Sequence, residues 1–181
     1  MHKKIISFRP SLYQKVKTIF QKPEYGFISE TEGYTALAYT PEIAARNELV
    51  LNMMLRLGMG VGYDAIGSLI GTYVSPSMRD AESIPKRIMI TSHLDTVVNG
   101  GAFDGPLGIF TGLEVIRILI EQDKKTPGFL NHPLELRVCP AEESASFTAT
   151  FGSKAVAGYY SVADLHNIYS AQDSSLSGYQ A

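Results

Sequence analysis

The chain contains 181 residues, with 16 lysines and arginines against 18 aspartates and glutamates, so its formal net charge is −2. This near-neutral balance argues against a protein that binds nucleic acid or a membrane surface electrostatically. Hydrophobic residues make up 45% and charged residues 19% of the chain. Such a composition is globular, and it excludes wholesale disorder, collagen and coiled-coil classes.

Cysteine content and apolar runs bear on the compartment. Cys139 is the only cysteine, so the chain can form no internal disulfide and no paired-cysteine motif, which fits a reducing compartment. The apolar run over residues 5–8 is too short for a signal peptide. The most apolar stretch, residues 107–120, is interrupted by Glu114 and Arg117 and is shorter than the roughly 20 residues that span a bilayer. We therefore expect a cytoplasmic protein without a transmembrane segment.

The first third of the chain is predicted to contain two helices. Apolar residues recur at helical spacing over residues 12–20 and indicate a short amphipathic helix that ends near Pro23. A polar connection that contains glycine follows. Residues 40–42 then supply a threonine N-cap, a proline at the first helical position and a glutamate in the first turn. With Gly58 as a terminator, they predict a helix over 41–57.

The remaining two thirds of the chain alternate between predicted strands and helices. Periodicity and turn residues predict strands over 65–73, 87–91 and 134–139, and helices over 106–122 and 153–169. A glycine-rich loop follows the strand over 87–91, and loops at strand ends commonly carry function. The order strand, helix, strand, helix indicates a βαβ unit. The sequence therefore predicts an α/β fold with a mainly parallel sheet.

Five polar residues stand at or beyond the carboxyl ends of the two clearest strands, where open α/β sheets place their sites. They are His93, Asp95, Asp104, Glu142 and Glu143. Imidazole nitrogens and carboxylate oxygens are the ligand set for Zn²⁺ or a similar divalent ion. In a continued strand, Asp95 shares a face with His93 and could accept its second ring N–H. Adjacent glutamates point in different directions, so one could bind metal while the other takes a proton from water.

Two segments resemble the metal motifs of a known family. The first comprises Ser92-His93-Leu94-Asp95-Thr96-Val97, Asn99-Gly100-Gly101 and Phe103-Asp104-Gly105, and the second comprises His132-Pro133-Leu134-Glu135, Glu142-Glu143 and Gly152-Ser153-Lys154. Both resemble hydantoinase/carbamoylase-type amidases, a branch of the dinuclear M20 metallopeptidase family. That branch includes N-carbamoyl-L-amino-acid hydrolases and allantoate amidohydrolases. The resemblance covers roughly residues 31 to 178.

The resemblance implies a fold and a role for each candidate residue. The fold would be a three-layer α/β/α, zinc-exopeptidase-like catalytic domain, with 1–38 as an N-terminal helix and connection and 39–181 as a core that holds both motifs. Two divalent ions, Zn, Mn, Co or Ni, are implied as cofactors. By resemblance, the metal ligands are His93, Asp104 as the bridge and Glu143, while Glu142 is the general base and Asp95 orients the histidine. Substrate-binding residues are not identified.

The resemblance also implies what this chain lacks. Family chains are more than twice as long, and their lid and dimerisation domain and two further histidine ligands have no counterpart here, so we expect an N-terminal half with weak or incomplete metal binding and no appreciable activity. The eleven-residue step from His93 to Asp104 favours a carbamoylase or allantoate hydrolase over a dipeptidase. Alternatives are a non-catalytic remnant and an M20-type aminopeptidase or dipeptidase. The expected partner is a small-molecule substrate rather than nucleic acid or a membrane, and family members are homodimers.

Overall fold

The structure is a computed structural model that describes residues 11–78 and 85–180. The run over residues 5–8, which we expect not to be a signal peptide, lies outside these ranges. The helices are α1 (Ser11–Phe20), α2 (Pro41–Arg56), α3 (Pro106–Lys125), α4 (Phe151–Val156) and α5 (Val162–Asn167), with short 3₁₀ turns at Pro23–Tyr25 and Pro76–Met78. The strands are β1 (Phe27–Ser29), β2 (Gly33–Tyr34), β3 (Gly60–Tyr63), β4 (Leu69–Tyr73), β5 (Ile88–His93) and β6 (Leu134–Cys139).

Four of these strands form the main sheet, in the order β3-β4-β6-β5, and β1 and β2 form a separate short hairpin. The β3–β4 and β4–β6 pairs are antiparallel, and the β5–β6 pair is parallel. The predicted α/β class is confirmed, but the sheet is mixed, whereas the sequence predicts a mainly parallel one. The short turn between β3 and β4 can connect only antiparallel strands, and β4 also runs antiparallel to β6.

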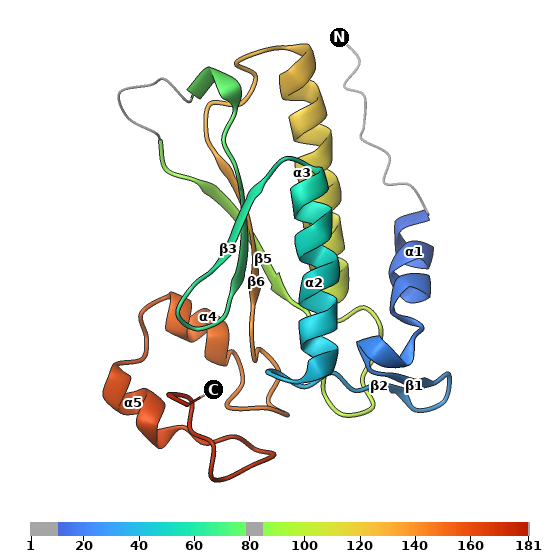
Figure 1. The fold of residues 1–181 in the computed structure, drawn as a ribbon, viewed down its shortest axis with the longest axis vertical. Helices are drawn as coiled ribbons and strands as arrows, with labels where there is room; N and C mark the ends of the chain where they lie inside the picture. The colour runs from blue at the N-terminus through green and yellow to red at the C-terminus, as the bar shows by residue number, and fades with distance from the viewer. Residues whose placement is uncertain (1–10, 79–84, 181) are drawn as a thin grey trace.

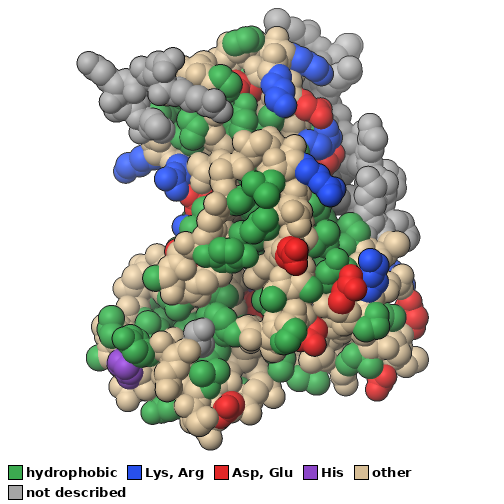
Figure 2. Space-filling model, viewed as in Figure 1, with side chains coloured by type: hydrophobic (Ala, Val, Ile, Leu, Met, Phe, Trp, Pro, Cys, Tyr) green, Lys and Arg blue, Asp and Glu red, His purple; other side chains and the backbone are tan. Residues whose placement is uncertain are grey.

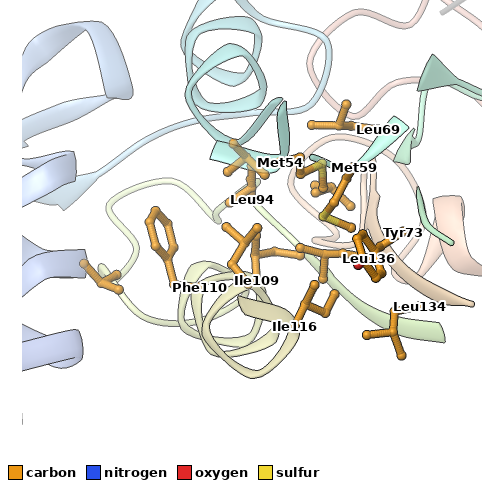
Figure 3. Packing of buried hydrophobic residues seen from close by; sticks show 14 of the residues in the cluster. Met54, Met59, Leu69, Tyr73, Leu94, Ile109, Phe110, Ile116, Leu134 and Leu136 are labelled. Carbon is orange, nitrogen blue, oxygen red and sulfur yellow. The ribbon is translucent and has the colours of Figure 1, made fainter. Parts of the chain in front are cut away.

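Helices cover one face of this sheet. In Figure 1, α2 and α3 lie on the same side, where α2 contacts β3 and β4 and α3 contacts β5 and β6. Figure 3 shows the core between these layers, in which Met54 and Met59 meet Ile109, Ile116 and Leu136. The helix α3 approaches the sheet closely at Gly112, where a Cβ atom would lie 2.8 Å from Leu136. This packing fixes the ends of β5 and β6 against α2 and α3.

The opposite face of the sheet is polar and open. Figure 2 shows the molecule hollowed on that side, above the segment that contains α4 and α5. Arg137 donates to Asp64 and Glu135, and Arg87 donates to Glu135 over 2.7 Å. The described residues thus form a helical layer on one face of the sheet, which fits an incomplete three-layer domain. None of the helices in the described ranges combines the length and apolarity needed to cross a bilayer.

Two predicted elements differ from the structure. The strand predicted over 65–73 begins only at Leu69, because the Asp64 carboxylate accepts the N–H groups of Ile66 and Ser68 and closes a turn. The helix predicted over 153–169 is broken into α4 and α5. The break follows Gly158, which adopts a left-handed conformation with φ of 73°.

The sequence also misses three short strands. The strand β3 carries two glycines, which weaken a strand pattern. The hairpin of β1 and β2 falls in the predicted polar connection before α2 and contains only five strand residues. By contrast, the predicted helices over 12–20, 41–57 and 106–122 and the strands over 87–91 and 134–139 are confirmed within a few residues.

Candidate metal centre

The candidate residues lie beyond the carboxyl ends of β5 and β6. These strands are parallel and pair His93 with Cys139, so both end at the same edge of the sheet. Asp95 follows the first of these residues by two positions, and the Glu142-Glu143 pair follows the second within four. The topology therefore brings the two sequence motifs to one place, although Asp104 and Glu142 are 38 positions apart in the chain.

Three of the candidates, His93, Asp104 and Glu143, approach one another closely. One potential ligand atom from each lies within 4.8 Å of the other two, and His93 Nε2 is 3.7 Å from Asp104 Oδ1. Atoms that bind one ion at about 2.0–2.2 Å lie at most about 4.4 Å apart, so a small movement completes the geometry. Asp104 is free to make it, because its side chain is 83% exposed. The donor set fits a divalent transition-metal cation.

The ring of His93 is oriented by the backbone around it. Its Nδ1 atom lies 3.1 Å from the carbonyl oxygen of Asp95 and 3.5 Å from that residue's Oδ1. A carbonyl oxygen can only accept, so Nδ1 donates its hydrogen and Nε2 keeps a lone pair for a ligand. Gly105 leaves room for the ring, because a Cβ atom there would lie 2.5 Å from Nδ1.

The side chain of Asp95 ties the two motifs together. It is only 2% exposed, and its Oδ2 atom accepts a 2.9 Å hydrogen bond from the backbone N–H of Glu143. Because this buried carboxylate is bonded to the backbone of Glu143, it fixes the distance between the ends of β5 and β6. Asp95 thus contacts His93 through its carbonyl oxygen and, at 3.5 Å, through its carboxylate, and it holds Glu143 through that carboxylate.

Electrostatics at this cluster favour a bound cation. Burial raises the pKa of Glu143, and although His93 lowers it, the charges of Asp104, Asp95 and Glu142 raise it further. Burial lowers the pKa of His93, but hydrogen bonding and charge from Asp95, with the charge of Glu143, outweigh that effect and raise it above its ordinary value. Neighbouring carboxylates contribute to both shifts, and a divalent cation would offset their charge.

Glu142 does not join the three clustered residues. Its carboxylate accepts hydrogen bonds from the backbone N–H and the hydroxyl of Ser153, at 2.5 and 2.8 Å. Both donors belong to the first turn of α4, so Glu142 caps that helix. The two glutamates therefore point in different directions, as their adjacency predicts. The loop between them and α4 is held by Phe147, which stacks on Phe151 with ring centroids 4.9 Å apart.

Sequence reasoning misses Arg46, which supports the site from α2. Its guanidinium group is buried, donates to the carbonyl oxygens of Tyr25 and Leu94, and lies 4.7 Å from the ring of Phe20. The bond to Leu94 fixes the backbone between His93 and Asp95. A signal was present, because residue 46 falls on the apolar face of α2, between Ile43 and Val50. A charge at such a position must have partners inside the protein.

Comparison with known proteins identifies relatives of this chain. The sequence model of Peptidase family M28 matches residues 73–173, whereas the resemblance described above bears the name M20. An N-carbamoyl-L-amino-acid amidohydrolase of Paenarthrobacter aurescens is 36% identical over 144 residues, which cover 78% of this chain and 32% of that protein. An allantoate amidohydrolase of Bacillus subtilis is 29% identical over 165 residues, 91% of this chain and 37% of that protein.

Solved structures show the same likeness. A hydantoinase/carbamoylase family amidase from Burkholderia ambifaria superposes with a TM-score of 0.73 at 27% identity, covering 94% of this chain and 38% of that one. These relatives and this structure confirm the amidase resemblance carried by the two motifs. The chain spans about a third of the length of the curated relatives it matches.

Proposed function

The chain belongs to Peptidase family M28, and we propose that it is the N-terminal metal-binding half of a hydrolase of linear amide or ureido C–N bonds. Throughout its described fold it resembles hydantoinase/carbamoylase-type amidases. The observation that carries the proposal is the convergence of His93, Asp104 and Glu143 at one edge of the sheet. Substrates of the N-carbamoyl amino acid or allantoate type are proposed from the names of its relatives.

The three clustered residues would hold the metal. Two divalent ions, of Zn, Mn, Co or Ni, would polarise the substrate carbonyl and lower the pKa of water. His93 offers its Nε2 atom, and Glu143 offers a carboxylate that lies among other carboxylates. The exposed Asp104 can move toward both residues. Three residues are few for two ions, since one catalytic ion commonly takes three protein ligands. We therefore propose weak metal affinity for the 181-residue chain.

Glu142 would transfer protons, and Asp95 would hold the metal ligands in place. We assign to Glu142 the removal of a proton from the attacking water and its return to the leaving nitrogen. The two hydrogen bonds from Ser153 hold this carboxylate in place, and each of its oxygens keeps a further lone pair. Asp95 holds Glu143 through its N–H and His93 through its carbonyl oxygen.

Two substitutions separate the ligand from the base. Glu143→Gln should lower the affinity for Zn²⁺ or Mn²⁺ by about tenfold or more, because a neutral amide is a poor ligand for a divalent ion. Glu142→Gln should leave that affinity within about twofold, since Glu142 lies outside the cluster. Isothermal titration with each metal, on the purified chain, measures both. Equal loss of affinity in the two variants would contradict the assignment.

A second candidate is a non-catalytic remnant of such a hydrolase, whose clustered residues bind no metal. Titration with Zn²⁺ or Mn²⁺ discriminates between the two, because the proposed function requires metal binding that depends on Glu143 and the remnant predicts none. Hydrolysis of N-carbamoyl amino acids and of allantoate, assayed with added Mn²⁺ or Zn²⁺, measures the activity of the chain itself. We expect no appreciable turnover from the 181-residue chain alone. Metal-dependent turnover with two ions bound per chain would show that further ligands come from residues outside this cluster.

A further inference from the structure

A small pocket lies between α2 and the ends of β5 and β6. Its lining includes Asn47 from α2, Leu94 and Asp95 from the end of β5, and Cys139 and Ala141 from the end of β6. Its free space has room for about one water molecule. The pocket therefore adjoins the residues that carry the candidate metal ligands, but it contains none of the three ligands itself.

Two buried oxygen atoms of the lining residues lack a donor. Asp95 Oδ1 and Asn47 Oδ1 are both inaccessible to solvent, and neither has a hydrogen-bond partner among the described residues. Asp95 Oδ1 is 3.5 Å from His93 Nδ1, longer than the roughly 2.7–3.2 Å of an N–H···O hydrogen bond. A buried carboxylate oxygen without a donor is costly, so such atoms normally find one in a partner or in an ordered water.

One water molecule would satisfy both atoms. Both are acceptors, so they cannot bond to each other, whereas a water has two hydrogens and can donate one to each. Buried waters occupy sites of this kind, which are polar and of one-molecule size. We propose that a water molecule held in this pocket bridges Asn47 to Asp95, and that Asn47 is thereby a positioning residue for the candidate metal centre.

Through this bridge, α2 would help to fix the positions of two candidate ligands, His93 and Glu143. Fixing Oδ1 fixes the carboxylate plane of Asp95, whose Oδ2 holds the N–H of Glu143 and whose carbonyl oxygen holds the ring of His93. The neighbouring Arg46 already grips the carbonyl oxygen of Leu94 over 2.6 Å. The helix α2 therefore anchors two consecutive residues after His93, one directly and one through water.

Two substitutions of Asn47 distinguish the water bridge from simple packing. Asn47→Leu keeps the branching of the side chain at Cγ, fills the pocket with methyl groups and leaves Asp95 Oδ1 without a donor. Asn47→Ala removes more packing but leaves room for water beside Asp95. The bridge predicts that the leucine variant is the more damaging, whereas a packing role predicts that the alanine variant is. Glu48→Ala, at an exposed position of the same helix, is the control.

The experiment uses the full 181-residue chain and two measurements. In the metal-free protein, the backbone amide signal of Glu143, whose N–H donates to Asp95 Oδ2, should match the wild type in Asn47→Ala and Glu48→Ala and shift in Asn47→Leu. Zn²⁺ affinity, by competition with a chelating dye, should fall by about tenfold in the leucine variant, as for other groups that orient metal ligands. It should change by no more than about threefold in the other two.

Several results would overturn the bridge. They are a larger effect of alanine than of leucine, an unchanged Glu143 amide signal in a folded leucine variant, and a crystal structure of the wild type in which Asn47 bonds directly to Asp95. Circular dichroism checks that each variant folds, and the crystal structure tests the water even if one does not. The metal affinity rests on the proposed function, but the Glu143 amide signal does not. A wild type that binds no Zn²⁺ therefore contradicts that function, and the Glu143 amide signal then decides on the bridge.

Discussion

At the scale of single residues, the candidate centre gathers like charges that weaken the fold until a cation binds. The raised pKa of Glu143 has burial as its main cause and the carboxylates of Asp104 and Asp95 as contributing causes. A group whose pKa is raised on folding stabilises the fold below its unfolded pKa, here 4.5, and this stability is lost as the pH rises through the folded value. At neutral pH the charged Glu143 therefore destabilises the fold of the metal-free chain.

Glu143→Gln should stabilise the metal-free protein at pH 7 and not at pH 4. Removing the charge relieves the repulsion at neutral pH, whereas at pH 4 the wild-type carboxyl is already largely protonated. We expect a rise in melting temperature of about 1–3 °C at pH 7, the shift that a gain of up to about 1 kcal/mol gives a chain of this size. With added Zn²⁺, the wild type should have the higher melting temperature of the two, because a bound ligand stabilises the protein that binds it. The same difference at both pH values would contradict this account.

Arg46 should contribute more to stability than any surface arginine. Burial lowers its pKa to about 10, so it stays charged at neutral pH and depends on the carbonyl groups of Tyr25 and Leu94. Arg46→Met leaves both carbonyls without their donor and should lower the free energy of unfolding by roughly 2–4 kcal/mol. Arg117→Met, which removes ion pairs on the surface of α3, should cost about 1 kcal/mol or less. Urea unfolding measures both, and equal losses would show that burial does not matter here.

At the scale of elements, the junction of β6 and α4 is set by a contact that only glycine permits. A Cβ atom at Gly152 would lie 2.1 Å from the carbonyl oxygen of Pro140. Backbone cannot move aside as a side chain can. The close approach places Ser153 where it donates to Glu142, so the glycine in the second sequence motif serves the position of the proposed base.

Gly152→Ala should therefore destabilise the chain by about 1–3 kcal/mol, the range for overpacking, although alanine is the better helix former. Gly62→Ala is the matched control, because nothing lies within 4 Å of a Cβ atom there. We expect the control to change the urea midpoint little. The two-dimensional amide spectrum should show shifts at Glu142 and Ser153 in the first variant alone. A stable Gly152→Ala protein with wild-type shifts would mean that Pro140 moves freely.

Elements with strong local signals were the ones that could be predicted from the sequence. The helix α2 has a proline at its first position and an acid in its first turn, and β6 is buried at every position except Arg137. The misses have local physical causes that become visible only in three dimensions. The Asp64 carboxylate closes a turn inside the strand predicted over 65–73, and a left-handed Gly158 ends α4 within a segment of helical pattern.

The convergence of His93, Asp104 and Glu143 follows from chain order, because β5 and β6 carry the two motifs to one sheet edge. The sequence does not show what Arg46, Asn47 and Ser153 contact. Arg46 is visible as a charge on the apolar face of α2 and Ser153 as part of the second motif, but their partners depend on how α2 and α4 pack against the ends of β5 and β6.

At the scale of the whole molecule, the strand that carries His93 lies at an edge. Among the described residues, β5 pairs with β6 on one side alone, and its side chains Ile88 and Met89 are 53% and 50% exposed. An unpaired apolar edge is a template for a further strand. Charged side chains that bond to one another occupy the open face of the sheet beside this edge. The apolar edge of β5 is therefore the part of this surface that favours association with another chain.

We expect the purified chain to self-associate through this edge at micromolar concentrations. Met89→Lys places a charge on the free edge of β5, the device by which natural sheets prevent edge pairing, and should weaken self-association by about tenfold, equivalent to about 1.4 kcal/mol. Leu55→Lys, at an equally exposed position of α2, is the control and should leave it unchanged. Light scattering coupled to size-exclusion chromatography measures the dissociation constants. A wild type that stays monomeric, or a control that weakens association as much, would rule out β5 as the contact.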